Sequence, residues 1–170
     1  MIHVDLSRCT GCRRCETACA FFRTGRISRH LARIKVVNLY ETGIDAPVVC
    51  VQCAEQYCMP CPEDALATGP LGQVIYSPTL CTLCGRCEQR CPIGAIEIIE
   101  HTVVVCDLCG GNPRCVQACT EGALTYIPQE NRDSLNRYEH ISKGNPPGEK
   151  RKLYASDRGE SLRAQWRDSH

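Results

Sequence analysis

The sequence predicts a small α+β fold built from short β-hairpins and short helices, with staples in place of a large hydrocarbon core. The 170 residues include only nine aromatic side chains, so a large apolar core is not expected. They also include sixteen cysteines, far more than an ordinary chain of this length carries. These cysteines recur in four groups, and short β-prone runs flank the groups. Small scaffolds of this kind generally depend on disulfides or metal.

The third cysteine group identifies the chemistry. Residues 81–92 read C-T-L-C-G-R-C-E-Q-R-C-P, which is the bacterial ferredoxin run C-x2-C-x2-C-x3-C-P that holds [4Fe–4S] clusters. A tight loop with a thiolate at every third residue can wrap around three iron corners of one cubane. The fourth cysteine lies one helical turn further on, and the proline behind it suits the first turn of a short helix.

The same motif is used four times, which predicts four [4Fe–4S] clusters. Every cysteine belongs to one of the four motifs and none is left over. The motifs comprise Cys9, Cys12, Cys15 and Cys19; Cys50, Cys53, Cys58 and Cys61; Cys81, Cys84, Cys87 and Cys91; and Cys106, Cys109, Cys115 and Cys119.

The expected location in a reducing cytosol favours metal binding over disulfide formation as the role of the cysteines. The first residues, M-I-H-V-D-L-S-R-C, show neither a basic and apolar export signal nor a twin-arginine signal. We therefore expect a soluble, cytoplasmic protein, unless it is exported as the passenger of a signal-bearing partner. In a reducing cytosol, clustered cysteines indicate metal ligands. No apolar run approaches the roughly 18 residues that span a bilayer.

Zinc is the alternative metal. Structural zinc sites use two C-x2-C pairs separated by about a dozen or more residues. Three cysteines at successive spacings of two would leave a surplus ligand beside one zinc, so the zinc alternative applies mostly to the atypical second motif. A second alternative is that some clusters only brace the fold, which is compatible with electron transfer.

The predicted repeating unit is strand, cluster loop, one or two helical turns, and strand. Turns are expected at 69–72 and 100–101. Within the connector 21–47, residues 32–40 form a further candidate strand. β-prone runs precede motifs at 2–5, 74–77 and 102–105, and follow them at 93–99, 121–127 and, more weakly, 62–68.

The connector also carries arginines at every third or fourth position, namely Arg23, Arg26, Arg29 and Arg33. A solvated or cluster-shielding face is the favoured interpretation, and a docking patch is the alternative. After Pro128 the chain is polar and has no cysteine. Residues 131–143 predict a short helix with Leu135, Tyr138 and Ile141 on one side. Beyond residue 144 we expect an extended tail, either floppy or anchored on a partner through Leu153, Tyr154, Leu162 and Trp166.

Charge and motif content narrow the function classes. Four clusters with their thiolates would take the net charge from +1 to about −7, which argues against nucleic-acid binding. No nucleophile–base pair, phosphate-binding glycine loop or flavin motif is present, so the chain is not expected to turn over a substrate alone. The histidines, which show no ligand spacing, are His3, His30, His101, His140 and His170.

Residues beside the cysteines are expected to tune the clusters. Glycines let backbone amides approach the sulfurs, and hydrogen bonds or nearby cations stabilise the more negative reduced state. Ordinary surface charge is the alternative for the cations. The glycines are Gly11, Gly85, Gly110 and Gly111, and the arginines are Arg13, Arg14, Arg86 and Arg90.

Over roughly residues 1–127 the chain resembles the four-cluster ferredoxin-like electron-transfer subunits of molybdenum and tungsten oxidoreductases. It looks closest to the small subunit of tungsten-dependent aldehyde oxidoreductases and benzoyl-CoA reductases. The resemblance rests on all four motifs, including the opening C-D-L-C of the last. Two positions depart from the family: only Met59 and Pro60 precede Cys61, and Thr120 replaces the usual proline.

The resemblance implies that the outer motifs pair, as do the inner ones. It implies an outer module at 1–49 and 100–127 and an inner module at 50–99. Residues 128–170 lie beyond the resemblance, and we expect them to form a C-terminal extension that docks on a partner. The two modules would be pseudo-symmetric. The implied ligand sets are Cys9, Cys12, Cys15 with Cys119; Cys106, Cys109, Cys115 with Cys19; Cys50, Cys53, Cys58 with Cys91; and Cys81, Cys84, Cys87 with Cys61.

The function implied is a relay of single electrons between a tungsten or molybdenum pterin subunit that oxidises an aldehyde and a flavin/NAD-linked partner. Copies of this chain could also stack, so that electrons pass from one copy to the next. One alternative is a free-standing polyferredoxin or cluster carrier. Another is the iron–sulfur subunit of a cytoplasmic formate dehydrogenase or formate hydrogenlyase. The tail and the arginine-bearing connector favour a stable complex, since a diffusible carrier needs neither.

Overall fold

A computed structural model describes residues 1–127 and 132–169. Within these residues the strands form four separate two-stranded antiparallel sheets, which is the predicted α+β arrangement of short hairpins and short helices. The strands are β1 (Ile2–Val4), β2 (Ile34–Leu39), β3 (Ile44–Val49), β4 (Leu66–Thr68), β5 (Val74–Tyr76), β6 (Ile96–Ile99), β7 (Thr102–Val105) and β8 (Leu124–Tyr126). The helices are α1 (Arg14–Thr24), α2 (Arg86–Arg90), α3 (Arg114–Gln117), α4 (Asn136–Ser142) and α5 (Pro147–Asp168), with 3-10 turns at Leu6–Arg8, Arg29–Leu31 and Leu108–Gly111.

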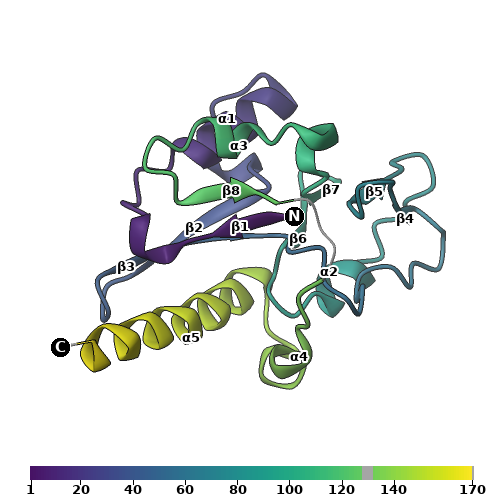
Figure 1. Cartoon of the computed structure of the whole chain (residues 1–170). Coiled ribbons are helices and arrows are strands. Elements are labelled where there is room, and N and C mark those ends of the chain that lie inside the picture. The colour runs from purple at the N-terminus through teal and green to yellow at the C-terminus, as the bar shows by residue number, and fades with distance from the viewer. Residues whose placement is uncertain (128–131, 170) are drawn as a thin grey trace.

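The first and last motifs are brought together by long-range pairing. Strand β1 pairs with β8, and Ile2 lies opposite Tyr126. Helices α1 and α3, which carry later cysteines of the first and fourth motifs, pack on each other above these strands (Figure 1). The outer motifs are therefore neighbours in space although they lie at opposite ends of the cysteine-bearing region.

Two hairpins follow the inner motifs, and both predicted turns are confirmed. At the 69–72 turn of β4–β5, the Gly69 amide donates to the Gln73 carbonyl at 2.8 Å. The β6–β7 hairpin turns at Glu100 and His101, whose φ angles of 48° and 59° suit a two-residue type I′ turn. This hairpin crosses the boundary at 99/100, so the two predicted modules share it. The division into modules remains a prediction.

The predicted strand at 32–40 is confirmed as β2, but its partner β3 was not predicted. Residues 44–49 lie in what the sequence indicates only as a connector. In β3, Pro47 lacks the amide that a central strand would need. A two-stranded hairpin leaves each strand one free edge, so the proline is tolerated there. The β2–β3 pair then offers a face for α5 to cover (Figure 1).

The expectation of an extended tail beyond residue 144 is wrong, because 147–168 form the longest helix in the described residues. Pro147 occupies the first turn, where its fixed φ is compatible with a helix. The buried positions Lys150, Tyr154, Ala155 and Gly159 make a narrow stripe along α5. Gly159 lies so close to β2 that a Cβ there would be 2.8 Å from Leu39 Cδ1. Packing of this stripe on β2–β3 overrides the polar composition.

The short helix predicted at 131–143 is confirmed in part as α4; residue 131 lies outside the described residues. Leu135 and Tyr138 are both buried, whereas Ile141, which was predicted to lie on the same side, is 56% exposed. The Tyr138 ring meets Tyr154 edge-on at 4.9 Å, and its hydroxyl donates to Asp157 at 2.6 Å. Of the four residues named as anchors, Tyr154 is thus buried within its own chain. Leu162 packs partly on the core, and Leu153 and Trp166 remain exposed.

No helix follows the second motif, so the predicted unit fails there. Residues 62 and 63 form a turn before β4. Prolines 60 and 62 flank Cys61 and each removes a backbone donor, and Asp64 has a left-handed φ of 48°. The left-handed conformation of Asp64 interrupts any helical run directly after this motif.

The connector arginines contact the fourth motif. Arg23 forms an ion pair with Asp107, and Arg33 pairs with the same carboxylate at 2.9 Å. Arg26 pairs with Glu100 at 2.9 Å. These contacts favour the cluster-shielding interpretation for Arg23 and Arg33, whose side chains are half-buried.

The buried core is aliphatic, as the scarcity of aromatic residues predicts. Tyr138 and Tyr154 are the buried aromatic side chains among the described residues, and the remainder are isoleucine, valine, leucine, alanine and cysteine. Within 1–127 and 132–169, no helix has the length and apolar character needed to cross a membrane.

Candidate metal centres

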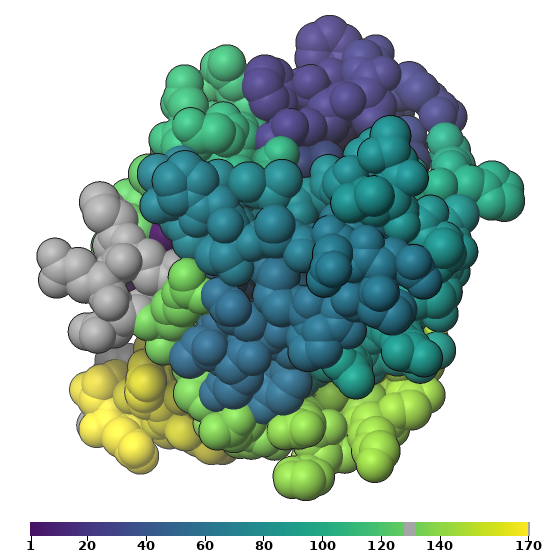
Figure 2. Space-filling view, turned by 90° about the vertical axis from the view of Figure 1, so that its right-hand side faces the viewer, coloured from purple at the N-terminus to yellow at the C-terminus, as the bar shows by residue number. Residues whose placement is uncertain are grey.

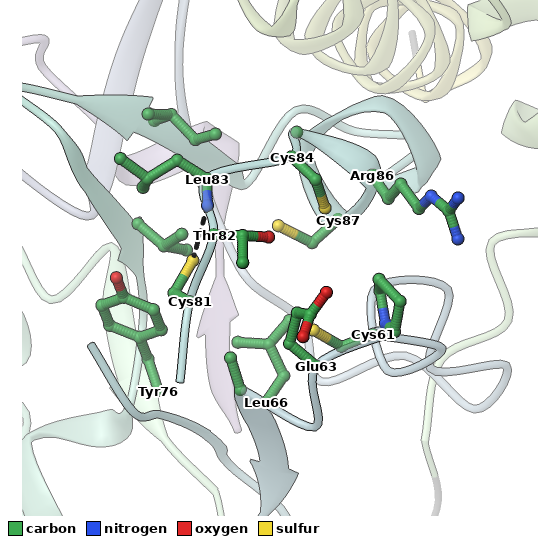
Figure 3. A pocket seen from close by; sticks show the side chains of 15 residues that line it. Cys61, Glu63, Leu66, Tyr76, Cys81, Thr82, Leu83, Cys84, Arg86 and Cys87 are labelled. Atoms are coloured by element: carbon green, nitrogen blue, oxygen red, sulfur yellow. Dashed lines mark hydrogen bonds between the residues drawn. The ribbon is translucent and has the colours of Figure 1, made fainter. Parts of the chain in front are cut away.

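Four cysteines from two different motifs line one cavity in the inner half of the molecule (Figure 3). Cys81 and Cys84 come from the loop before α2, Cys87 lies in the first turn of α2, and Cys61 comes from the second motif. Their sulfur atoms point into the same space, and all four are free thiols. Aliphatic side chains from β4, β6 and β7 close the cavity behind them: Leu66, Ile98 and Val103.

Two further cavities show the same crossing of motifs. One is lined by Cys50, Cys53, Cys58 and Cys91, with Ile93, Ile96 and Val105 around them. The other is lined by Cys9, Cys12, Cys15 and Cys119, with Val36 and Leu124 around them. In each, three cysteines come from one motif and the fourth from its partner motif.

The remaining four cysteines also lie together. Cys19 interacts electrostatically with Cys109, and Cys106 interacts with both. Cys115 interacts with all three. The structure thus gathers the cysteines into the four groups that the resemblance implies. That these groups are the ligand sets stays a prediction.

The donors fit an iron–sulfur cluster. Four thiols around an aliphatic cavity supply the soft ligands that such clusters take. Within residues 1–127 and 132–169, no three His, Cys, Asp or Glu side chains converge as they would around a single metal ion. Cys12 and Cys84 are exposed to solvent, whereas Cys15, Cys19, Cys106 and Cys115 are buried.

Burial keeps the thiols neutral in the metal-free chain. Desolvation raises the pKa of Cys15, Cys58 and Cys106 to about 12 in each case. It raises the pKa of Cys87 to about 11. Because thiolate is the form that binds metal, iron must displace protons from these groups as the clusters assemble.

Backbone amides point at several sulfurs, as predicted, but most come from residues that the sequence did not single out. The amides of Leu83, Ala95 and Arg33 donate to the sulfurs of Cys81, Cys91 and Cys19 at 3.4, 3.3 and 3.2 Å. The Leu83 bond is visible in Figure 3. Among the predicted glycines, the Gly11 amide bonds to Cys9. Position in the motif could have indicated two of these donors, because Leu83 and Gly11 each lie two residues after the first cysteine of a motif.

Gly85 has a different role from the one expected. Its φ of 76° lies in the left-handed region, and α2 begins at the next residue. Arg13 takes the same conformation, with φ of 59°, directly before α1. Both positions turn the loop between the second and third cysteines of a motif into a helix. Glycine does this without the steric cost that a side chain adds.

Two glutamates, Glu16 buried and Glu88 half-buried, were missed by the sequence analysis. Glu16 and Glu88 each follow the third cysteine of a motif. A Glu16 oxygen accepts from the Val36 amide at 2.8 Å, and Glu88 accepts from the Ile98 amide at 2.6 Å. Each glutamate therefore connects the helix that carries it, α1 or α2, to a strand by a hydrogen bond. The repeated pair Cys-Glu was the signal in the sequence.

The arginines near the motifs are engaged in structural contacts. Arg13 pairs with Glu16 at 3.1 Å, and Arg14 donates to the Thr120 hydroxyl at 3.3 Å. Arg90 donates to the Pro60 carbonyl at 3.3 Å, next to Cys61. Arg86 extends away from the sulfurs of its cavity in Figure 3.

Comparison with protein families bears out the cofactor. A family described as 4Fe-4S binding domain matches residues 74–97, and a second family with that description matches residues 1–27. These stretches contain the third motif and the first. The chain accordingly binds more than one [4Fe–4S] cluster.

Relatives extend the match over most of the chain. The aliphatic sulfonate oxidoreductase, polyferredoxin-like subunit of Pyrococcus furiosus is 41% identical, covering 71% of this chain and 71% of its own. The NADH-dependent phenylglyoxylate dehydrogenase subunit beta of Aromatoleum evansii is 37% identical over 76% of this chain, which spans only 30% of that protein. A solved active site complex BamBC of benzoyl coenzyme A reductase is 25% identical, covers 83% of this chain and 84% of its own, and has a TM-score of 0.46. This chain belongs to the family of ferredoxin-like iron–sulfur electron-transfer subunits of oxidoreductases.

Proposed function

We propose that the chain relays single electrons through four [4Fe–4S] clusters inside a multi-subunit oxidoreductase. The observation that carries the proposal is the grouping of all sixteen cysteines into four sets of four, each drawn from two motifs. The bound clusters supply one-electron chemistry, which the side chains of this protein do not.

The proposed ligands are the four groups described above. Cys119 would complete the first motif's cluster, and Cys19 the fourth's. Cys91 would complete the second motif's cluster, and Cys61 the third's. In this arrangement each cluster links two motifs that lie far apart in the sequence. Cluster assembly would therefore close the outer and inner modules, at 1–49 with 100–127 and at 50–99.

The protein's own groups have three tasks in this proposal. The thiolates hold the clusters, and the amides of Leu83, Ala95 and Arg33 stabilise charge on the sulfurs. Aliphatic residues from the short strands keep water away from the cavities. The exposed cysteines, Cys12 and Cys84, are where the outermost clusters would come nearest to redox partners.

The partners we propose are a catalytic subunit with a tungsten or molybdenum pterin that oxidises an aldehyde, and a flavin/NAD-linked subunit. Support comes from the relatives, whose names include an oxidoreductase subunit and an NADH-dependent dehydrogenase subunit. The arm at 128–170 would dock one of them through its exposed Leu153 and Trp166. The segment carrying the second and third motifs forms the middle of the face in Figure 2, which is a second surface on which copies could stack. We place this complex in the cytoplasm.

Iron and labile-sulfide analysis of the purified chain, with electron paramagnetic resonance after dithionite reduction, tests the relay. About sixteen irons per chain are expected if each set holds one four-iron cluster. A value near eight, or stoichiometric zinc, contradicts it. Size-exclusion chromatography with mass analysis of the native protein tests the complex. A species running alone at 18.9 kDa would favour the free-standing carrier instead.

A further inference from the structure

The first turns of α5 bury a lysine beside one of the cysteine groups. Lys150 is 1% exposed and is among the largest fully buried side chains of the described residues. Its Nζ donates to the Gln89 carbonyl at 2.5 Å and to the Glu88 carbonyl at 3.2 Å. Among the residues that the structure describes, Lys150 makes no salt bridge. Its charge is therefore met by backbone carbonyls.

Those carbonyls belong to the last turn of α2, whose C-cap residue is Cys91. Cys91 lines the cavity shared with Cys50, Cys53 and Cys58, and it interacts electrostatically with Lys150. The ammonium group of Lys150 is thus held beside the backbone that leads into Cys91, one of the four cysteines of this cavity. No other cysteine interacts with Lys150 in the same way among the described residues.

Further contacts fix the position of the lysine. A Cβ at position 94 would lie 2.2 Å from the Pro147 carbonyl oxygen, so only glycine allows the start of α5 to approach this loop. Arg151 donates to the Gly94 carbonyl at 2.8 Å and pairs with Glu97 at 3.2 Å. The lysine is therefore anchored on both sides along α5.

A charge held in this way acts strongly on its surroundings. Water is excluded, so the field of the ammonium group is less screened than at the surface. Glu88 is the one carboxylate that interacts with Lys150 among the described residues, and it is already hydrogen-bonded to the Ile98 amide. Reduction of a [4Fe–4S] cluster adds one negative charge, so a nearby cation favours the reduced state.

We propose that Lys150 is a positioning residue that raises the reduction potential of the cluster on Cys50, Cys53, Cys58 and Cys91. The proposal rests on the ligand set given under the proposed function. It gives α5 a role beyond docking, because the helix carries a buried cation beside Cys91 of this cluster. The electron that reduces the cluster comes from the redox partner, or from dithionite in the experiment below.

The test is a redox titration of the full-length, cluster-loaded chain, followed by electron paramagnetic resonance. In Lys150→Met, one of the four reduction equilibrium constants should fall about tenfold, equivalent to about 59 mV for a one-electron couple. The other three reduction equilibrium constants should stay unchanged. Lys150→Arg, which keeps the charge, should restore most of the potential.

The matched control is Lys152→Met, which removes the same charge from an exposed position on the same helix. It should shift none of the four potentials, because solvent screens the charge there. Lys150→Gln removes the charge but keeps an NH2 group that can donate to the carbonyls, and it should reproduce the shift of Lys150→Met.

Several outcomes would overturn the inference. With about sixteen irons retained, unchanged potentials or an equal shift of all four would show that Lys150 only braces α5. Loss of iron from both Lys150→Met and Lys150→Gln would likewise assign a structural role. A wild-type chain that never holds about sixteen irons would instead refute the proposed four-cluster relay.

Discussion

At the scale of single residues, the two glutamates after the third cysteine of the first and third motifs link cofactor loops to strands. Glu16 is 2% exposed and accepts from Val36 and Arg13. Glu88 makes the equivalent bond to Ile98. Buried polar groups are costly when unpaired, so each glutamate and its partners depend on one another.

Replacing Glu16 with alanine should destabilise the protein by roughly 1–3 kcal/mol, because the Val36 amide and the Arg13 guanidinium lose their acceptor in a buried place. The measurement is the rate of cluster loss in denaturant, read from the visible absorbance. Glu41→Ala changes the same side chain at an exposed turn and should leave that rate unchanged. Equal rates in the two variants would contradict the role given to Glu16.

The crossed ligand sets can be tested by pairing cysteine replacements. Cys12→Ala and Cys119→Ala should each lower the iron content from about sixteen to about twelve per chain, because one cluster is lost. If both cysteines hold the same cluster, the double variant should stay at about twelve, since interacting sites are not additive. The control combines Cys12→Ala with Cys84→Ala, which should reach about eight. A Cys12/Cys119 variant that also reached about eight would refute this pairing.

At the scale of elements, α5 is held by a narrow stripe and by one tight approach to the loop after Cys91. The helix packs on β2 and β3, and the approach depends on the absence of a side chain at Gly94. The helix is otherwise polar, so few contacts determine where it lies. Helices of this kind owe their stability in proteins mainly to tertiary packing.

Gly94→Ala should therefore loosen the start of α5. Its Cβ would meet the Pro147 carbonyl, and its φ of 62° adds the strain of a left-handed residue. Amide hydrogen exchange in the first turns of α5 should accelerate, and thermal stability should fall. Gly25→Ala carries a similar φ of 66° with nothing within 4 Å, so it isolates the strain. The expected cost of the strain alone is about 1–2 kcal/mol, and Gly94→Ala should cost more.

At the scale of the whole molecule, four two-stranded sheets share an aliphatic core with the cysteines themselves. An isolated two-stranded hairpin is marginal in water, and most of these have strands of only three or four residues. The clusters would thus supply cross-links between segments that the small sheets cannot hold together. The metal-free chain must instead bury many neutral thiols.

Removing the iron should consequently unfold most of the chain. Chelation under anaerobic conditions should bleach the visible absorbance and reduce the far-ultraviolet circular dichroism together, because cluster loss and unfolding are coupled. Any remaining signal should come from β2–β3 and α5, whose contacts are aliphatic. A colourless protein that keeps its full native spectrum would contradict the view that clusters hold this fold together.

Much of this fold and site could be predicted from local spacing. The intervals between Cys81, Cys84 and Cys87 report the shape of a cluster loop, which neighbouring residues alone determine. The runs at β1, β5, β6, β7 and β8 and the turn at 100–101 are likewise local signals. The groupings of distant cysteines came from a family resemblance, because spacing within one motif carries no information about its partner.

By itself, the sequence determined the four motifs, the metal they bind and the short-hairpin class, since these depend on residue type and on separation along the chain. Only the tertiary structure decided that β3 pairs with β2, that residues 147–168 form a helix, and that Lys150 lies against Cys91. A polar segment becomes ordered when a few side chains find a surface to bury against. That surface is made by residues far away in the sequence, so composition alone predicts a tail where packing produces a helix.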